Sequence, residues 1–177
     1  MLRKIVFYGV LAGIIVGIPM FALVFLSSGH TPGPYGMVIG YLTMLIALST
    51  VFVAIKQHRD GDLGGVIGFW PAFGLGLGIS VIASILYVLT WELVVSLAHL
   101  DFGRVYADAM IEQEKAKGVT GEALAKFVAE MEQFKIQYAN PLFRLPMTFS
   151  EIFPVGVLVS LVSAGLLRNR RFLPARR

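Results

Sequence analysis

The chain contains no cysteine and little charge, and each shortage excludes a class of protein. Without cysteine there is no disulfide framework, no thiol nucleophile and no zinc site with sulfur ligands. Charged residues make up only 15% of the 177 residues, against about 25% in ordinary soluble domains. The hydrophobic share is 56%, which excludes a disordered chain, a coiled coil or a collagen-like repeat. A soluble enzyme is disfavoured, because a domain this small could not bury so much apolar surface.

Four apolar segments are each long enough to cross a hydrocarbon core, which needs about 20 residues. We expect spans over residues 5–26, 36–55, 66–97 and 147–167. The first is too long to read as a signal peptide, so we expect it to be retained. The third would be about 48 Å long as a helix, against a core of about 30 Å. It must tilt, project beyond the bilayer or break at Trp70-Pro71, and tilt with projection is favoured.

The only soluble-looking stretch, residues 101–146, lies between the third and fourth spans. Apolar residues recur there at helical spacing, before and after Gly118. We therefore predict an all-α membrane protein, a four-transmembrane-helix bundle with an extramembrane amphipathic helical pair between helices 3 and 4. Residues 1–100 form the first three spans, 101–146 the helical hairpin, and 147–177 the fourth span with a basic tail. The face predicted to dock a partner consists of Leu124, Phe127, Met131 and Phe134.

Basic residues predict the orientation, since they mark the cytoplasmic side of a membrane. Nine of the fifteen lie in three short segments that must share one side, around Lys4, Lys56 and the tail after residue 167. The 101–146 segment has six basic and seven acidic residues. We therefore expect both termini in the cytoplasm and the hairpin outside. Lys56 and Arg59, in a solvated turn between helices, would meet lipid headgroups. The net charge of +4 then reflects topology rather than a nucleic-acid partner.

Small residues repeat every four positions along three of the spans. Such ladders let helix backbones approach closely in a membrane. They could form a dimerisation seam, but packing within one bundle is favoured because four helices must pack. The glycines predicted to serve this packing are Gly9, Gly13, Gly17, Gly68, Gly76 and Gly156.

Two acids, Glu92 and Glu151, lie inside the apolar spans, where charge is unfavourable and often functional. Helices running in opposite directions place both near the outer leaflet. In one reading, the two carboxylates share a proton, a cation or a lipid headgroup. In the favoured reading, Glu151 occupies the first helical turn, capped by Ser150 or Thr148, and Glu92 pairs with Arg144 or with the neighbours of Trp91 at the interface. The candidate polar site comprises Glu92, Glu151, Tyr87, Trp91, His99 and Arg144.

Segments spread over nearly the whole chain carry a resemblance to a known family. They are GGVIGFW (64–70), GLGLGI (74–79), ILYVLTWE (85–92), DF (101–102), YANPLFR (138–144) and EIFPVG (151–156). They resemble the bacterial family known as domain of unknown function 4199, in its four-span form. The resemblance implies a bacterial inner-membrane protein and supplies no activity or site residues.

The sequence favours a non-enzymatic protein that binds a partner or lipid through the outer helices. No nucleophile, phosphate-binding or metal motif occurs, so neither a catalytic site, a metal nor a cofactor is expected. The expected partners are the lipid bilayer and a membrane protein or a second copy of the chain. The alternative is a transporter-type or lipid-handling protein that uses an acidic site at Glu92 and Glu151 and would have to be oligomeric.

Overall fold

The protein is built of long helices, with no strand among the residues that the structure describes, 1–26 and 34–174. In this computed structural model four of its helices are long and apolar enough to cross a membrane, and two form a hairpin outside them. The prediction of an all-α membrane protein is confirmed. The helices are α1 (Leu2–Leu26), α2 (Pro34–Gln57), α3 (Phe69–Leu97), α4 (Phe102–Ala116), α5 (Gly121–Ala139) and α6 (Pro141–Leu167), with a π-helical turn, η1 (His58–Asp62), after α2.

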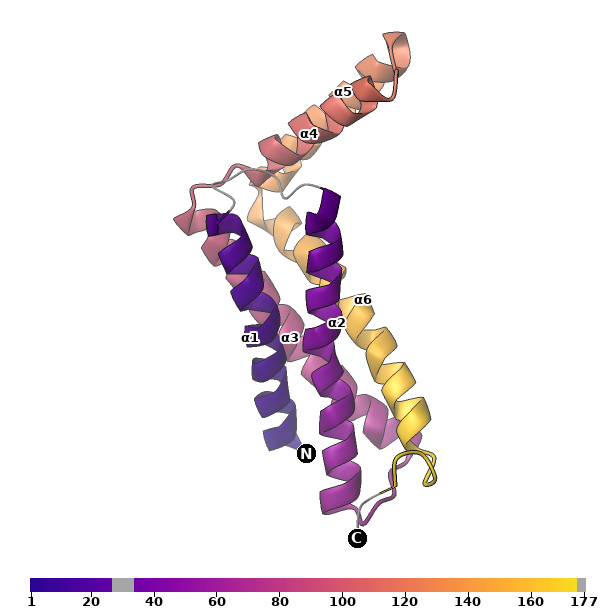
Figure 1. Ribbon diagram of the computed structural model, residues 1–177. Coiled ribbons are helices and arrows are strands. Elements are labelled where there is room, and N and C mark those ends of the chain that lie inside the picture. Colours follow the sequence, from indigo (N-terminus) through magenta and orange to yellow (C-terminus); the bar gives the residue numbers. More distant parts are fainter. Residues whose placement is uncertain (27–33, 175–177) are drawn as a thin grey trace.

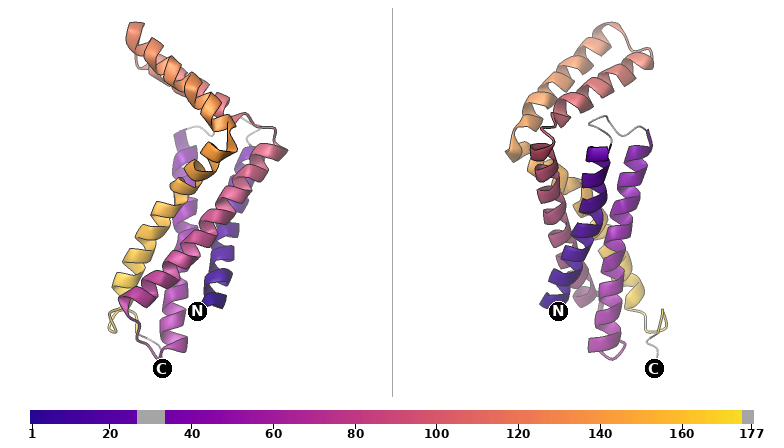
Figure 2. Two further views of the ribbon diagram at one scale, coloured as in Figure 1. Left: turned by 180° about the vertical axis from the view of Figure 1, so that it is seen from behind. Right: turned by 60° about the vertical axis from the view of Figure 1, so that its left-hand side comes forward.

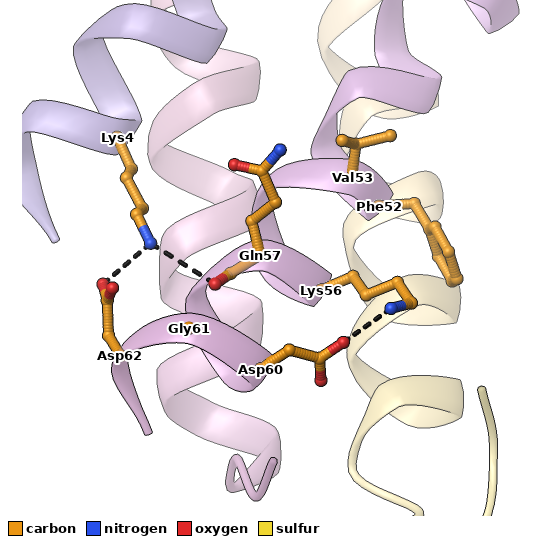
Figure 3. A pocket seen from close by; sticks show the side chains of 8 residues that line it. All are labelled: Lys4, Phe52, Val53, Lys56, Gln57, Asp60, Gly61 and Asp62. Atoms are coloured by element: carbon orange, nitrogen blue, oxygen red, sulfur yellow. Dashed lines mark hydrogen bonds and ion pairs between the residues drawn. The ribbon is translucent and has the colours of Figure 1, made fainter. Parts of the chain in front are cut away.

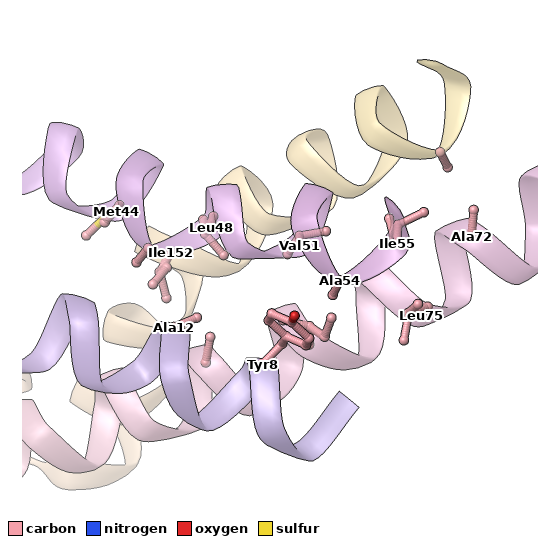
Figure 4. Packing of buried hydrophobic residues seen from close by; sticks show 14 of the residues in the cluster. Tyr8, Ala12, Met44, Leu48, Val51, Ala54, Ile55, Ala72, Leu75 and Ile152 are labelled. Atoms are coloured by element: carbon pink, nitrogen blue, oxygen red, sulfur yellow. The ribbon is translucent and has the colours of Figure 1, made fainter. Parts of the chain in front are cut away.

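The helix α3 is the centre of the bundle. It contacts α1, α2 and α6, most extensively α1 and α6, and it runs obliquely behind them (Figures 1 and 2). Buried Leu48, Val51 and Ile55 of α2 meet Leu75 of α3 and Ile152 of α6 in one apolar core (Figure 4). Away from this core, large side chains such as Phe7, Ile46 and Leu89 are exposed. Apolar exposure on this scale suits side chains that face lipid.

Three glycines of α1 provide the close approach between α1 and α3. A Cβ added at Gly9 or Gly13 would lie 2.6 Å from the Cβ of Ile82 or Leu86, respectively. At Gly17 it would lie 2.9 Å from the hydroxyl of Thr90. Side chains of α3 therefore occupy the groove that the glycines leave. These glycines are used for packing inside one chain.

A second close approach joins α3 to α6 through paired small residues. A Cβ added at Gly76 would meet Ser160, and one at Gly156 would meet Ser80, each within 2.9 Å. The two serine hydroxyls lie 3.3 Å apart and also donate to backbone carbonyls of their own helices. All their polar atoms are thus bonded inside the membrane-spanning region, as a lipid environment requires.

The remaining ladder glycine, Gly68, is not in a helix. It is the N-cap of α3, and a Cβ there would meet only Pro71, at 3.4 Å. Pro71 itself lies in the first turn of α3, where its missing N–H has no helical partner to lose. The helix is therefore unbroken, and a break at Trp70-Pro71 does not occur.

The helices α4 and α5 form the outer hairpin, which extends obliquely away from the bundle (Figures 1 and 2). Gly118 in the turn between them and Gly121 at the start of α5 have φ +83° and +65°, the left-handed region that glycine adopts most easily. Lys135 of α5 donates to Asp108 of α4 at 2.8 Å, which adds a polar tie between the two helices. Since α6 begins at Pro141 and not near Met147, the elbow between hairpin and bundle is short. Residues 27–33, between the first two predicted spans, lie outside the described residues.

Candidate functional site at the bundle–hairpin junction

An ion pair joins the outer end of α3 to the first turns of α6. Arg144 donates through Nε to Glu92 Oε1 at 2.7 Å and through Nη2 to Oε2 at 2.6 Å. Both side chains are mostly buried, with exposed fractions of 12% and 26%. Local sequence places Arg144 there, because Asn140 accepts from the Leu142 N–H as the N-cap and Pro141 occupies the first helical position. Two parallel hydrogen bonds of this kind fix the orientation of the guanidinium relative to the carboxylate as well as the distance between them.

Tyr138 is the common neighbour at this junction. Its hydroxyl accepts a 2.8 Å hydrogen bond from Trp91 Nε1 of α3, and its carbonyl accepts one from Arg144 Nη1 at 3.2 Å. The guanidinium of Arg144 lies 5.8 Å from the centre of the Tyr138 ring. Burial raises the pKa of Tyr138 to about 12, although the Trp91 N–H acts in the opposite direction. The phenol therefore stays neutral over the physiological range.

Aromatic rings extend the junction into the hairpin. Phe102, the first residue of α4, makes an edge contact with Trp91, with ring centres 5.0 Å apart. It also packs on Tyr138, and Tyr106 packs on Phe134. Gly103 permits this approach, since a Cβ there would lie 3.3 Å from the Cβ of Tyr138. Both helices of the hairpin are thus attached to the end of α3.

Glu151 has a different partner from Glu92. The hydroxyl of Tyr87 donates to Glu151 Oε2 at 3.2 Å. The two carboxylates therefore have separate partners, and Glu92 pairs with Arg144 as in the favoured reading. The predicted position of Glu151 in the first turn of its helix is wrong, because α6 begins ten residues earlier, at Pro141. The N-cap of α6 is Asn140, not Ser150 or Thr148.

His99 lies apart from this cluster. It is exposed in the turn after α3, at φ +47°, with its backbone N–H bonded to the Ser96 carbonyl. Among the described residues, no group of three His, Cys, Asp or Glu side chains is placed to hold a metal ion.

The predicted docking stripe faces the partner helix of the hairpin. Leu124, Phe127, Met131 and Phe134 are all half-buried, and Phe134 contacts Tyr106 of α4. Much of this apolar face is therefore used to hold α5 against α4. The exposed surface of the hairpin mixes charged, amide and alanine side chains, and Ile136 is a large apolar residue on it at 76% exposure.

Comparison with known proteins assigns the chain to a family. Residues 7–169 match the family described as "Protein of unknown function (DUF4199)". The chain belongs to this family. No curated protein and no solved structure matches it. All the junction residues described above lie inside the DUF4199 match.

The opposite end of this DUF4199 chain holds a residue whose role the sequence does not reveal. Arg59 in η1 is fully buried, not at the headgroups, so that prediction is wrong. Its guanidinium donates to the carbonyls of Leu167, Phe172 and Leu173, and through Nε to Asp60 at 2.6 Å. Leu167 ends α6, where carbonyls lack helical partners. A single arginine in a polar turn carries no signal for this tertiary role, whereas Tyr138 follows Phe134 at helical spacing, which is a signal for its burial.

Proposed function

We propose that this protein is a non-enzymatic membrane anchor that presents the α4–α5 hairpin to a partner at one face of the membrane. The observation that carries the proposal is the two-point contact between Arg144 and Glu92. Together with the Trp91–Tyr138 hydrogen bond, it holds the hairpin to the bundle at a defined angle. A hairpin attached through a mostly buried ion pair and several aromatic rings is pre-ordered, which reduces the entropy lost when it binds a partner.

The partner surface that we propose is the outer side of the hairpin. The stripe from Leu124 to Phe134 is half-buried between the helices, so a partner would meet Ile136 and the surrounding charged side chains. Interfaces commonly combine an apolar contact with a polar rim. The partner would be another membrane protein or the lipid surface, or a second copy of the chain.

We further propose that the protein lies in the bacterial inner membrane, with both termini in the cytoplasm and the hairpin outside. The distribution of basic residues supports this orientation, because α1 begins, α2 ends and α6 ends in basic segments. The segment that contains the hairpin has one more acidic than basic residue.

Site-specific crosslinking tests the proposed partner surface. A photoreactive phenylalanine analogue at Ile136 should yield a discrete adduct in native membranes, and the same group at lipid-facing Leu89 should not. Deleting residues 101–140 should preserve membrane insertion and remove co-purifying partners. The anchor proposal fails if Ile136 gives only the lipid background seen at Leu89, or if the deletion leaves every partner in place.

A second candidate function rests on Glu151. This carboxylate is in a membrane-spanning helix and accepts a hydrogen bond from the neutral Tyr87 hydroxyl. Ionisable groups at such positions often mark a transport or lipid-handling site. The protein would then act as an oligomer, with Glu92 and Glu151 lining the path. Proteoliposomes should show a proton, ion or lipid response that Glu151→Gln reduces. Full retention of that response in the Glu92→Gln/Glu151→Gln double variant would rule this function out.

A further inference from the structure

A pocket opens at the end of the bundle opposite the hairpin. Its volume is about 560 Å³, within the range of small-molecule sites. The first turns of α1 form one side, and the end of α2 with η1 forms the other (Figure 3). The residues that line it are Lys4, Phe52, Val53, Lys56, Gln57, Asp60, Gly61 and Asp62.

The wall of this pocket changes from apolar to charged along α2. Phe52 and Val53 lie one turn before Lys56, on the side of the membrane-spanning segment, and Val53 is 43% exposed. Lys56 and the acids of η1 follow at the polar end. In a bilayer this is the depth at which an acyl chain gives way to a headgroup. The pocket therefore offers an apolar surface to a chain and charged groups to a head.

The charged groups occur as two ion pairs. Lys4 donates to Asp62 at 2.8 Å, and Lys56 pairs with Asp60 (Figure 3). Asp62 also bonds His58 at 2.7 Å, and Asp60 bonds the buried Arg59 at 2.6 Å. The side chains of Lys4, Lys56 and Asp62 keep exposed fractions of 26%, 35% and 45%. Two ammonium groups and the Asp62 carboxylate are thus accessible in one cavity, whereas the Asp60 carboxylate is mostly buried, at 17% exposure.

We propose that this pocket binds the headgroup of a zwitterionic phospholipid that carries a primary ammonium, such as phosphatidylethanolamine. The phosphate would take hydrogen bonds from Lys4 and Lys56, and the ammonium would donate to Asp62. The Gln57 side chain, which extends between Lys4 and Val53, can donate a further hydrogen bond to the phosphate (Figure 3). Phe52 and Val53 would contact the first segment of an acyl chain.

The balance of charge selects among headgroups. A purely anionic head would draw Lys4 from Asp62 and bring no cation in its place, whereas Asp60 would keep its contact with Arg59. A choline head has both charges but no N–H, so it cannot donate to Asp62. A primary ammonium carries three donors and can replace Lys4 at Asp62. The pocket is at the far end from the hairpin, so this inference does not depend on the proposed function.

The decisive test uses the unmodified protein and a series of lipids. The purified full chain is delipidated, mixed with lipids of identical acyl chains, and examined by native mass spectrometry. The headgroups are phosphatidylethanolamine, its N-monomethyl and N,N-dimethyl forms, phosphatidylcholine and phosphatidylglycerol. We expect one retained lipid, with affinity falling at each methylation and about tenfold or more between the ends of the series. Equal retention of phosphatidylethanolamine and phosphatidylcholine, or stronger retention of phosphatidylglycerol, overturns the proposal.

Variants then locate the site. Lys4→Gln/Lys56→Gln and Asp62→Asn should each weaken phosphatidylethanolamine binding by about tenfold, as expected for the loss of charge-assisted hydrogen bonds. Lys117→Gln is the matched control, because it breaks the Lys117–Glu114 ion pair at the far tip of the hairpin. It should leave binding unchanged. Retention at the unmodified level in folded pocket variants also overturns the assignment.

Discussion

Arg144 and Glu92 are 52 residues apart in sequence, yet two parallel hydrogen bonds of 2.7 and 2.6 Å join them. They connect the helix that enters the hairpin to the helix that leaves it. The contact thus closes the base of the hairpin. One pair of side chains holds together the point where the chain leaves α3 for the hairpin and the point where it returns into α6.

Breaking this pair from one side should destabilise the protein. Arg144→Gln leaves the Glu92 carboxylate mostly buried and without its cation, and we expect a loss of about 1–3 kcal/mol in the free energy of unfolding. Glu92→Gln should have a similar effect. The Glu92→Gln/Arg144→Gln double variant should lose less than the sum of the two single changes. Thermal or chemical unfolding in detergent measures this cycle, and strict additivity would show that the pair does not couple.

An exposed ion pair provides the control for that cycle. Lys115→Gln removes a contact with Glu112 on the surface of the hairpin, where both side chains are largely exposed. We expect a change of less than about 0.5 kcal/mol.

The alkaline stability of the junction should depend on Tyr138. Its pKa is raised to about 12 by burial, against an ordinary value near 10. The unfolded chain loses this proton first, so the stabilisation is present below about pH 10 and is lost as the pH rises towards 12. Unfolding midpoints across this interval should fall in the unmodified protein and fall less in Tyr138→Phe. Parallel curves would contradict this assignment.

The Trp91→Phe variant tests the effect of the indole N–H on the pKa of Tyr138. The indole N–H favours the ionised phenol, so its removal should raise the pKa of Tyr138 further. Ultraviolet titration of tyrosinate absorbance measures the shift, with Tyr138→Phe identifying the signal. A lower pKa in Trp91→Phe would contradict the hydrogen bond.

Adding one methyl group to the first helix should disturb its contact with the third. Gly13→Ala places a Cβ 2.6 Å from the Leu86 Cβ, and we expect a loss of about 1–3 kcal/mol from overpacking. Gly40→Ala in α2 meets nothing within 4 Å and should leave stability unchanged or slightly raised. If the glycines served only a dimer seam, Gly13→Ala would instead lower the dimer fraction and leave monomer stability intact.

Replacing Arg59 should release the segment after α6. Arg59→Met leaves the carbonyls of Leu167, Phe172 and Leu173 without this donor, and Arg59→Lys cannot reach all of them with one ammonium. We expect faster tryptic cleavage at Arg168, Arg170 and Arg171 in both variants. Arg168→Gln, which removes an exposed arginine and not the buried one, should keep the remaining sites protected. Unchanged cleavage rates would contradict this role.

The sequence predicts the parts of this fold that depend on local composition. Long apolar runs identify all four spans, and helical spacing around Gly118 identifies the hairpin. The start of α6 was misplaced because Arg144 and Pro146 argue against a continuous apolar helix there. The tertiary contact with Glu92 stabilises Arg144 at that position. The distance between these two residues cannot be derived from a single sequence.

The candidate site was predictable to the same limited extent. Acids inside apolar spans point to Glu92 and Glu151, and its charge makes Arg144 one possible partner of Glu92. The hydrogen bond between Tyr138 and Trp91 is not predictable, since it depends on how α5 returns to α3. Arg59 could not be distinguished from Lys56, because both are cations in one turn and only their burial differs.

The burial of Arg59 has a consequence for the order in which the molecule assembles. Its acceptors on Leu167 and Phe172 are synthesised 108 and 113 residues later. During translation Arg59 can therefore pair with Asp60 but lacks its carbonyl acceptors until the fourth helix has been inserted. A ribosome-bound chain stalled before residue 160 should leave Arg59 open to an arginine-directed reagent, and a chain extended beyond residue 173 with the fourth helix released should protect it. Completion of the bundle is thus reported by a single side chain that was made in its first half.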